Sequence, residues 1–381
     1  MKFKFIFFFL SVSFLLLYCT RGNNNKMNSS PVEKEKFGTV DGKEIDIYTL
    51  TNQSGAQVRI INYGAIVVSL LMPDRNGNFA DIVTGYDSLK GYINDNSFFG
   101  AIVGRYGNRI DKGKFQLDGK NYQLTINSGE NHLHGGFKGF YKAVWDVEPL
   151  ENIPGNSLKL TYLSPDGDEG YPGTVKIAVT YTLTDNNELK IEYEGTTDKP
   201  TILNPTHHSY FNLTGDFSNT ILNHELYIDA DYFTPVNQNI IPTGEFAAVK
   251  NTPMDFRQPT PIGLHINDKY EQLKFGLGYD HNWALNEYRK GMVRKIASLY
   301  DPKTGRFMEI LTDQPGLQFY SGNFLNGTSI GKGGVAYQYR TALCLETQDF
   351  PDAPNKSNFP SAVLRPGETY KQTTIYEFSV K

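Results

Sequence analysis

The chain has 381 residues, with 37 lysine and arginine residues against 41 aspartate and glutamate residues, and a formal net charge of −4. This balance excludes the basic excess of a nucleic-acid-binding protein, and 20% charged with 39% hydrophobic residues excludes a disordered chain or a multi-span membrane protein. Aromatic residues reach 13%, with 36 glycines and 19 prolines, which favours a β-rich fold because strands accept aromatic side chains and need many turns.

The first 18 residues are predicted to form a signal peptide. Lys2 and Lys4 precede an apolar run over 5–18, which at about 14 residues is too short to span a bilayer but suits a secretory signal. Cys19 follows directly, and the polar stretch after it resembles the tether of a bacterial lipoprotein in which the cysteine carries the lipid. An ordinary cleaved signal with an incidental cysteine is the alternative.

This interpretation divides the chain into a signal peptide over 1–18, a polar tether over 19–36 and one exported domain over 37–381. The predicted location is outside a bacterial cytoplasm, either in the periplasm or anchored to the outer membrane through Cys19. The second cysteine, Cys344, stands inside an apolar run and is predicted to be a buried, inert thiol. Two cysteines are too few for a disulfide framework.

Three strand–turn–strand patterns follow along the chain. Apolar residues lead into a Gly- and Asn-rich turn over 66–83, a second pattern over 115–124 turns at Asp118-Gly119, and strict alternation of apolar and polar residues over 175–193 turns at 185–188. Long helical periodicity is nearly absent, and no linker divides the domain. The sequence predicts an all-β, single-domain fold, a large antiparallel β-sandwich whose strands could hold polar side chains rigidly around a carbohydrate.

All seven histidines lie between His132 and His281, and four of them form two tight pairs, His132 with His134 and His207 with His208. Because His207 and His208 are adjacent in a predicted strand, only one of them can face a given side. His132 and His134 would share a face if extended, and histidine-rich sites bind zinc or copper. No third ligand has a convincing spacing, so no metal is predicted.

Several polar residues stand where they are costly or suited to a ligand. Glu346 ends an apolar strand, where a carboxylate is expensive unless it is paired or is needed with a raised pKa. Arg105 and Arg109 lie among small residues and could grip a polar ligand, while Asp280 and Gln314 lie close to aromatic residues. Hydrogen-bonding groups beside flat apolar surface are the ingredients of a sugar site.

Seven segments together resemble the aldose 1-epimerase (galactose mutarotase) family in the expected order, from about residue 37 to the end. They span 104–110, 131–136, 164–173, 206–213, 278–282, 314–320 and 344–348. The resemblance implies a galactose mutarotase-like β-supersandwich, no metal, no organic cofactor, and interconversion of the α and β anomers of free aldohexoses such as glucose and galactose.

Opening a cyclic hemiacetal requires a general base and a general acid near the anomeric carbon, each acting in both directions with a pKa near the working pH. A glutamate whose pKa is raised by burial and a histidine suit these roles. The resemblance implies Glu346 as base, His208 as acid, His134 as a hydrogen-bond partner near the ring oxygen, and Arg109, Asn108, Asp280 and Gln314 as residues that bind the sugar hydroxyls.

Three other functions remain open at this stage. A carbohydrate-binding β-sandwich could keep the fold without catalysis, and a hexose-6-phosphate epimerase would need a basic pocket, of which no Arg or Lys cluster gives a sign. A glycosidase or lyase could use Asp280 and Glu346 as a carboxylate pair. The predicted partner is a small aldose, with no nucleic acid, with membrane contact only through Cys19, and with a monomer or weak dimer as the oligomeric state.

Overall fold

The computed structural model describes residues 1, 2, 4, 32–150 and 156–381. The predicted signal peptide and the predicted lipidation at Cys19 therefore fall almost entirely outside the described residues, as does most of the predicted tether. Within the described ranges, no helix is long and apolar enough to cross a membrane.

Strands make up three larger sheets and several two-stranded pairs, and every pairing between named strands is antiparallel. The nine-stranded sheet has the order β11 (Asp146–Leu150), β12 (Asn156–Ser164), β13 (Val175–Leu183), β14 (Glu188–Thr197), β28 (Tyr370–Val380), β24 (Arg306–Thr312), β23 (Arg294–Tyr300), β18 (Glu225–Ile228) and β21 (Thr260–Pro261). The six-stranded sheet has the order β17 (Tyr210–Phe211), β26 (Leu343–Gln348), β25 (Gly316–Tyr320), β22 (Asp280–Ala284), β19 (Tyr232–Thr234) and β20 (Ala247–Ala248).

The other strands form a third sheet and two-stranded pairs, and the described residues also form two α-helices. The five-stranded sheet runs through β1 (Glu33–Val40), β2 (Lys43–Thr51), β3 (Gln57–Ile61), β4 (Ile66–Pro73) and β5 (Phe79–Asp81). The pairs are β6 (Ala101–Val103) with β16 (Thr206–His208), β7 (Arg109–Ile110) with β10 (His132–Leu133), β8 (Lys114–Leu117) with β9 (Lys120–Gln123), and β15 (Thr201–Ile202) with β27 (Val363–Leu364). The α-helices are α1 (Leu89–Asn94) and α2 (Glu271–Gly276).

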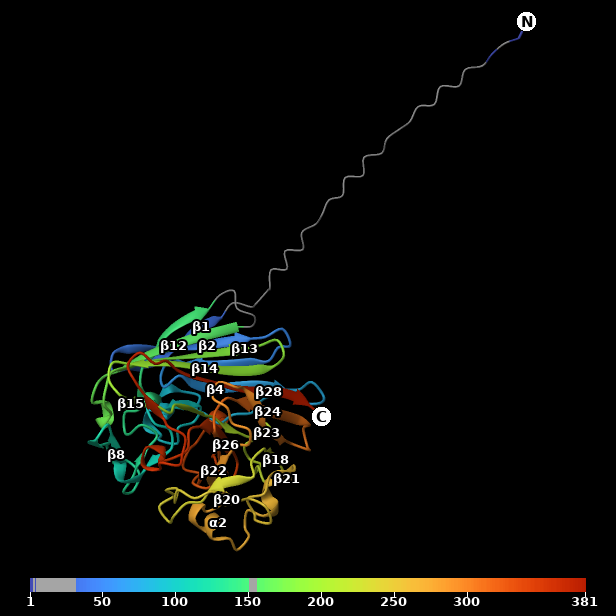
Figure 1. The fold of residues 1–381 in the computed structure, drawn as a ribbon. Coiled ribbons are helices and arrows are strands. Elements are labelled where there is room, and N and C mark those ends of the chain that lie inside the picture. Colours follow the sequence, from blue (N-terminus) through green and yellow to red (C-terminus); the bar gives the residue numbers. More distant parts are fainter. Residues whose placement is uncertain (3, 5–31, 151–155) are drawn as a thin grey trace.

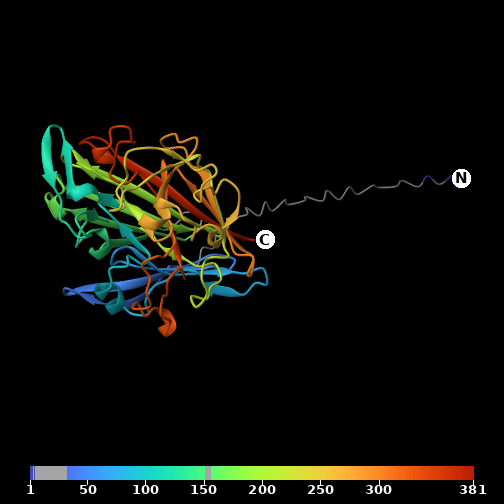
Figure 2. The same cartoon turned by 90° about the horizontal axis from the view of Figure 1, so that it is seen from below.

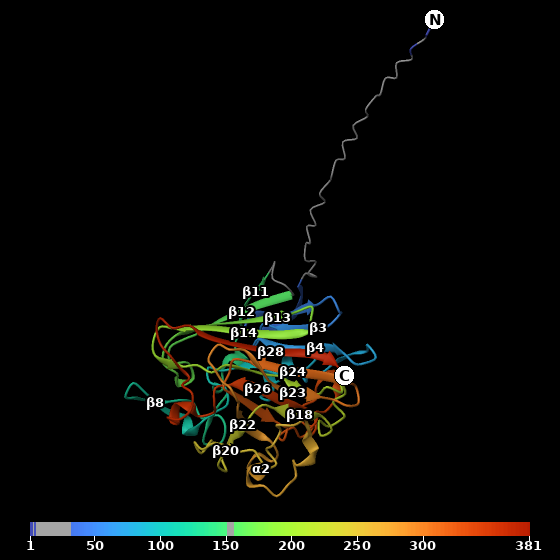
Figure 3. The same ribbon diagram turned by 45° about the vertical axis from the view of Figure 1, so that its right-hand side comes forward.

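The predicted antiparallel β-sandwich is confirmed. Figure 3 shows the strands of the nine-stranded sheet following one another from β11 to β18, and Figure 2 shows the five-stranded sheet, in blue, as a separate layer beneath it. One hydrophobic core joins all three sheets, because Leu50 of β2, Val179 of β13 and Leu345 of β26 belong to a single cluster of buried side chains.

All three predicted hairpins are present. The alternation over 175–193 becomes β13 paired with β14, with Val179 opposite Tyr193, and the apolar residues of both strands face the core. The pattern over 66–83 becomes β4 and β5, and the pattern over 115–124 becomes β8 and β9. In each case the apolar–polar period and the turn residues specified the hairpin.

The sheet starts earlier than the predicted domain boundary at residue 37. Strand β1 begins at Glu33, inside the predicted tether, and pairs with β2. The first four residues of β1 are exposed, and Lys34 Nζ lies 2.7 Å from Asp46 Oδ2 across the pair. This edge strand carries no apolar alternation because backbone pairing and charged side chains hold it. A hydrophobic pattern therefore could not reveal it.

Elements far apart in the chain converge on one side of the six-stranded sheet. Figure 1 shows β26 and β22 below β14 and β28 of the nine-stranded sheet. The two-stranded pairs β16–β6 and β7–β10 meet these strands, because residues of both pairs line the same cavity as residues of β26 and β22.

Candidate active site

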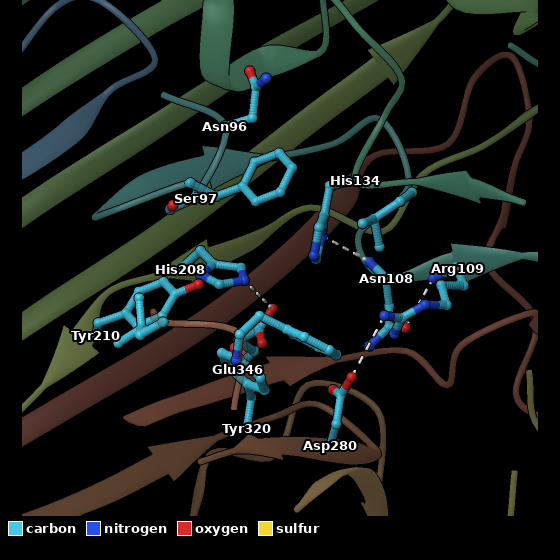
Figure 4. Close-up of a pocket in the computed structure, with 14 residues that line it drawn as sticks. Asn96, Ser97, Asn108, Arg109, His134, His208, Tyr210, Asp280, Tyr320 and Glu346 are labelled. Atoms are coloured by element: carbon cyan, nitrogen blue, oxygen red, sulfur yellow. Dashed lines mark hydrogen bonds and ion pairs between the residues drawn. The ribbon is translucent and has the colours of Figure 1, made fainter. Parts of the chain in front are cut away.

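A cavity of about 190 Å³ opens where these strands meet. Six of the seven residues that the family resemblance implicates line it: Asn108, Arg109, His134, His208, Asp280 and Glu346. Figure 4 shows their side chains directed toward one another from separate elements. The fold therefore brings together predicted residues that are up to 238 positions apart in the sequence, from Asn108 to Glu346.

Glu346 is the carboxylate at the bottom of this arrangement. The strand β26 is buried along its whole length, and its alternation puts Cys344 and Glu346 on one face and Leu343 and Leu345 on the other. Glu346 is only 2% exposed, and its Oε2 atom has no hydrogen-bond partner within the described protein. The nearest basic group is His208, whose Nε2 lies 3.6 Å from that oxygen.

Burial sets the protonation of this carboxylate. Desolvation raises the pKa of Glu346 well above its ordinary value, the nearby Asp280 raises it further, and Arg109 partly opposes both. A carboxyl group of this kind takes up a proton near neutral pH much more readily than an exposed glutamate does. This is the property that a general base needs if it must also return the proton.

His208 faces Glu346 from strand β16. Its backbone carbonyl accepts a hydrogen bond from the amide of Gly100 at 3.0 Å, and Tyr210 and Phe98 pack around its ring. Burial lowers the pKa of His208 to about 4, because the charged imidazolium loses its hydration. Once protonated, His208 is therefore a strong acid.

His207 turns to the opposite side, as the strand prediction requires. Its Nε2 lies 2.7 Å from Ser209 Oγ, and its ring packs against Tyr181 and Tyr376 in the core. His207 is therefore packed in the core and does not line the cavity.

The other histidine pair does not share a face. His134 adopts a positive φ of 51°, so the segment is a turn rather than an extended strand at this point. His132 points elsewhere, with Nδ1 2.7 Å from the carbonyl of Thr125 and Nε2 2.6 Å from the hydroxyl of Tyr171. Of this pair, only His134 lines the cavity.

The hydrogen bonding of His134 fixes its tautomer. The backbone N–H of Asn108 donates to His134 Nδ1 at 3.1 Å, so that nitrogen carries no proton and the proton of the neutral ring is on Nε2. Burial, with His208 and Arg109 nearby, holds the pKa of His134 well below its ordinary value. His134 therefore favours the neutral form, which can donate a hydrogen bond from Nε2.

Arg109 and Asp280 form a polar pair at the side of the cavity. Their closest atoms, Arg109 Nη2 and Asp280 Oδ2, are 3.4 Å apart, and Gln318 Nε2 donates to Asp280 Oδ1 at 2.7 Å. The Asn108 side chain accepts a hydrogen bond from the amide of Arg109 at 2.9 Å. Fixed charged and amide groups of this kind suit the vicinal hydroxyls of a sugar.

The structure does not bring Gln314 to the cavity. Gln314 lies before the start of β25, whereas Tyr320 at the other end of that strand lines the cavity, and the Gln314 side chain donates to Asp313 at 3.2 Å. The glutamine that contacts the site is Gln318, which stands opposite Glu346 in the β25–β26 register and holds Asp280. The segment contains both glutamines, and its pairing with β26 decides which of them contacts Asp280.

Arg105 is a structural residue, against the expectation that it grips a ligand. It is 2% exposed and donates to Ser164 Oγ and to the carbonyls of Ser164, Pro165, Pro172 and Gly173. The segment over 164–173 thus wraps the guanidinium, which satisfies a buried charge with carbonyl oxygens. This explains the motif over 164–173 and the Arg105 position of the motif over 104–110, whereas Asn108 and Arg109 of the latter line the cavity.

His134, His208 and Glu346 each offer one atom that could ligate a metal, and among the described residues these atoms lie within 4.8 Å of one another. This set combines one residue from each histidine pair with Glu346, a combination that the sequence spacing did not indicate. The absence of a metal from the reaction stays a prediction.

Proteins of known sequence and structure resemble this chain closely. The galactose mutarotase of cattle (Bos taurus) is 45% identical over 324 residues, covering 85% of this chain and 91% of that protein. The aldose 1-epimerase of Escherichia coli strain K12 is 37% identical, covering 89% of this chain and 96% of that protein. The crystal structure of galactose 1-epimerase from Lactobacillus acidophilus NCFM matches with a TM-score of 0.81 and 30% identity, covering 92% of this chain and 98% of that one.

These relatives contradict the predicted localisation. The relatives at 45% identity are mammalian galactose mutarotases, including those of cattle and humans, and these matches give no support to an exported bacterial lipoprotein. The prediction depended on the apolar run over 5–18 and on Cys19, which lie outside the described residues. A short apolar run before a cysteine is a weak signal when taken alone. The predicted periplasmic or outer-membrane-anchored lipoprotein is therefore wrong.

The family itself is established by a match along most of the chain. The family model described as aldose 1-epimerase matches residues 46–377. This range contains the whole cavity and nearly all of the three sheets. The agreement of sequence, fold and cavity shows that the chain is an enzyme of the aldose 1-epimerase family.

Proposed function

We propose that Glu346 and His208 interconvert the α and β anomers of free aldohexoses, with Glu346 as the general base and His208 as the general acid. The observation that carries this assignment is the Oε2 atom of Glu346, which is buried, has no hydrogen-bond partner in the described protein and lies 3.6 Å from His208 Nε2. An unpartnered buried carboxylate is costly, so its retention is explained by a proton that it exchanges with substrate.

Ring opening then proceeds by two proton transfers. Glu346 takes the proton of the C1 hydroxyl, and His208 gives a proton from Nε2 to the ring oxygen. The electrons of the O–H bond form the carbonyl, and those of the C1–O5 bond take the new proton. Because both oxygens are bonded to C1, an acid and a base only a few ångströms apart can reach them together.

Ring closure reverses the roles after rotation about the C1–C2 bond. His208 takes the proton from the C5 hydroxyl, which attacks the other face of the carbonyl, and Glu346 returns its proton to the carbonyl oxygen. The pair therefore carries one exchangeable proton, held on His208 before opening and on Glu346 in the open form. Burial favours the state in which both groups are neutral and the proton is on Glu346, so ring opening starts from the less populated state with the proton on His208, and the two titrations are coupled through their contact.

The remaining cavity residues bind and orient the sugar. His134 is a fixed donor from Nε2 and suits the ring oxygen or a neighbouring hydroxyl. Arg109, Asn108 and Asp280 supply donors and acceptors for the hydroxyls away from C1. Gln314 has no such role in this proposal, because its side chain is turned to Asp313.

Neutral sugars, with glucose and galactose as the proposed substrates, fit this cavity better than sugar phosphates. Among the described residues that line it, the one arginine or lysine is Arg109, and its charge is already opposed by Asp280 at 3.4 Å. A phosphate would need at least one uncommitted basic group.

The test is the rate at which wild type changes the optical rotation of freshly dissolved α-D-glucose and α-D-galactose, compared with α-D-glucose 6-phosphate, each against a blank without enzyme. We expect acceleration with both neutral sugars and a kcat/KM for the phosphate lower by at least about 10-fold, because an unpaired buried phosphate costs more than one ~1.4 kcal/mol step. Equal or better use of the phosphate contradicts the substrate assignment. Sugar binding by calorimetry without any acceleration would favour a carbohydrate-binding module.

A further inference from the structure

Strand β26 contacts both ring nitrogens of His208. Glu346 lies at Nε2, and two residues earlier on the same face Cys344 places its Sγ atom 3.6 Å from His208 Nδ1. Cys344 is completely buried and stands opposite Tyr210 in the β17–β26 register. The sulfur is within the distance at which a thiol hydrogen-bonds to a ring nitrogen, which is longer than an N–H···O bond because sulfur is larger.

The partner at Nδ1 differs between His208 and the other histidines of this region. His134 and His281 each accept a backbone N–H at Nδ1, both at 3.1 Å, from Asn108 and from Asp280. A backbone N–H can only donate, so these two rings lose that hydrogen bond if they become imidazolium ions. Their neutral form is thereby locked.

A thiol can both donate and accept. When His208 is neutral with its proton on Nε2, the S–H group donates to Nδ1; when His208 is an imidazolium, or is neutral with its proton on Nδ1, the Nδ1–H donates to sulfur. Burial raises the pKa of the Cys344 thiol well above its ordinary value, so the group stays an uncharged thiol in each of these states. His208 thus keeps a partner at Nδ1 throughout the proton cycle.

We propose that Cys344 is a positioning residue that allows His208, and not His134, to pass a proton to and from the sugar. The proposal rests on the assignment of His208 as the general acid. The thiol orients the ring so that Nε2 faces the cavity, and it accommodates every protonation state that the cycle requires. The prediction that Cys344 is inert is therefore replaced by a hydrogen-bonding role, with no covalent chemistry.

The groups around His208 support a neutral partner at this position. The titratable groups packed against the ring are Glu346 and Cys344 from β26, Tyr210 from β17 and His134 from the turn after β10. Among the described residues, Glu346 is the one acidic side chain within 4.0 Å of a His208 nitrogen. A second carboxylate at Nδ1 would raise the pKa of His208 and weaken it as an acid, whereas a thiol does not.

The test compares Cys344→Ala and Cys344→Ser with Leu345→Val. The alanine and valine variants each lose one buried heavy atom on the same strand, but Leu345 faces the core and not His208. Three quantities are measured for each variant: kcat and KM for α-D-galactose from pH 5 to 9, the melting temperature, and the nitrogen NMR spectrum of the sugar-free protein with ¹⁵N-labelled histidine. The His208 signals are identified by their loss in His208→Gln.

We expect Cys344→Ala to lower kcat about 10-fold, part of the ~10²–10⁴-fold that a positioned acid contributes, with KM nearly unchanged and an altered pH profile. The distribution of the proton between the two nitrogens of His208 should change in the same variant, and Cys344→Ser should recover part of kcat. Leu345→Val should match wild type in kcat, pH profile and spectrum while losing a similar amount of stability.

The proposal is overturned if Cys344→Ala keeps the wild-type kcat and the wild-type His208 spectrum. It is also overturned if Leu345→Val shows the same fall in kcat and the same change in the His208 spectrum as Cys344→Ala. If the wild-type protein gives no acceleration at all, the proposed function fails, and the spectrum of the sugar-free protein still decides whether Cys344 holds His208.

Discussion

Glutamine at position 346 is expected to lower kcat for α-D-galactose by about 10²–10⁴-fold, since the amide cannot take the C1 proton. KM should change much less, because Arg109, Asp280 and His134 still bind the sugar hydroxyls. Polarimetry with Glu346→Gln and with Glu192→Gln tests this. Glu192 is a surface carboxylate of β14 with a 43% exposed side chain, so the same chemical change there should leave kcat as in wild type.

The same substitution is expected to make the protein more stable at neutral pH. The pKa of Glu346 is raised in the folded state above its ordinary value of 4.5, so the folded state binds more protons than the unfolded state once the pH exceeds about 4.5. Stability is therefore full below that value and is lost as the pH rises toward the folded pKa. Glutamine carries no such penalty.

We expect Glu346→Gln to exceed wild type at pH 8 by on the order of 1–2 kcal/mol in the free energy of unfolding, and to match it more closely at pH 4.5. Urea unfolding at both pH values measures the difference. A variant less stable than wild type at pH 8 would show that Glu346 is held by a favourable contact and is not poised for proton transfer.

Substitutions of the two cavity histidines are expected to change different kinetic constants. His208→Gln should lower kcat by about 10²-fold or more with a small change in KM, because glutamine cannot release a proton to the ring oxygen. His134→Gln should mainly raise KM, because His134 donates a hydrogen bond from a locked neutral ring and glutamine still offers an N–H donor. Initial rates over a range of galactose concentrations separate the two quantities. Equal losses of kcat in the two variants would contradict the separate roles.

Several residues of the cavity could be predicted because polar side chains are unusual within apolar strands. Glu346 could be singled out because a carboxylate in an apolar strand is energetically costly. The alternation of side chains along the strand with His207 and His208 indicated that only one of the two faces the site. The hairpins were predictable for a related reason, since one buried face imposes an apolar–polar period.

The features that were missed depend on contacts between distant segments. Arg105 and Arg109 look alike in the sequence, but only the carbonyls of 164–173 make Arg105 structural. Gln314 and Gln318 lie in one segment, and the register with β26 decides which of them reaches Asp280. Strand pairing of this kind is not encoded in local periodicity.

The role of Cys344 was hidden for the same reason. In the sequence it is one apolar-like residue in a buried strand, and nothing there indicates that His208, which is 136 positions away, lies against its sulfur. The pairing of β17 with β26 creates this contact. The proposed acid and base could therefore be recognised in the sequence, whereas the residues that contact them become visible only in the fold.

The central claim is that Glu346 and His208 work as one proton-exchanging pair, and the double variant Glu346→Gln/His208→Gln tests it most directly. Its rate of change in the optical rotation of fresh α-D-galactose is compared with those of wild type and both single variants. Because loss of either group ends the same proton exchange, the double variant should be no slower than the slower single variant. A double variant slowed by the product of the two separate losses would show that the groups act independently and would contradict the account.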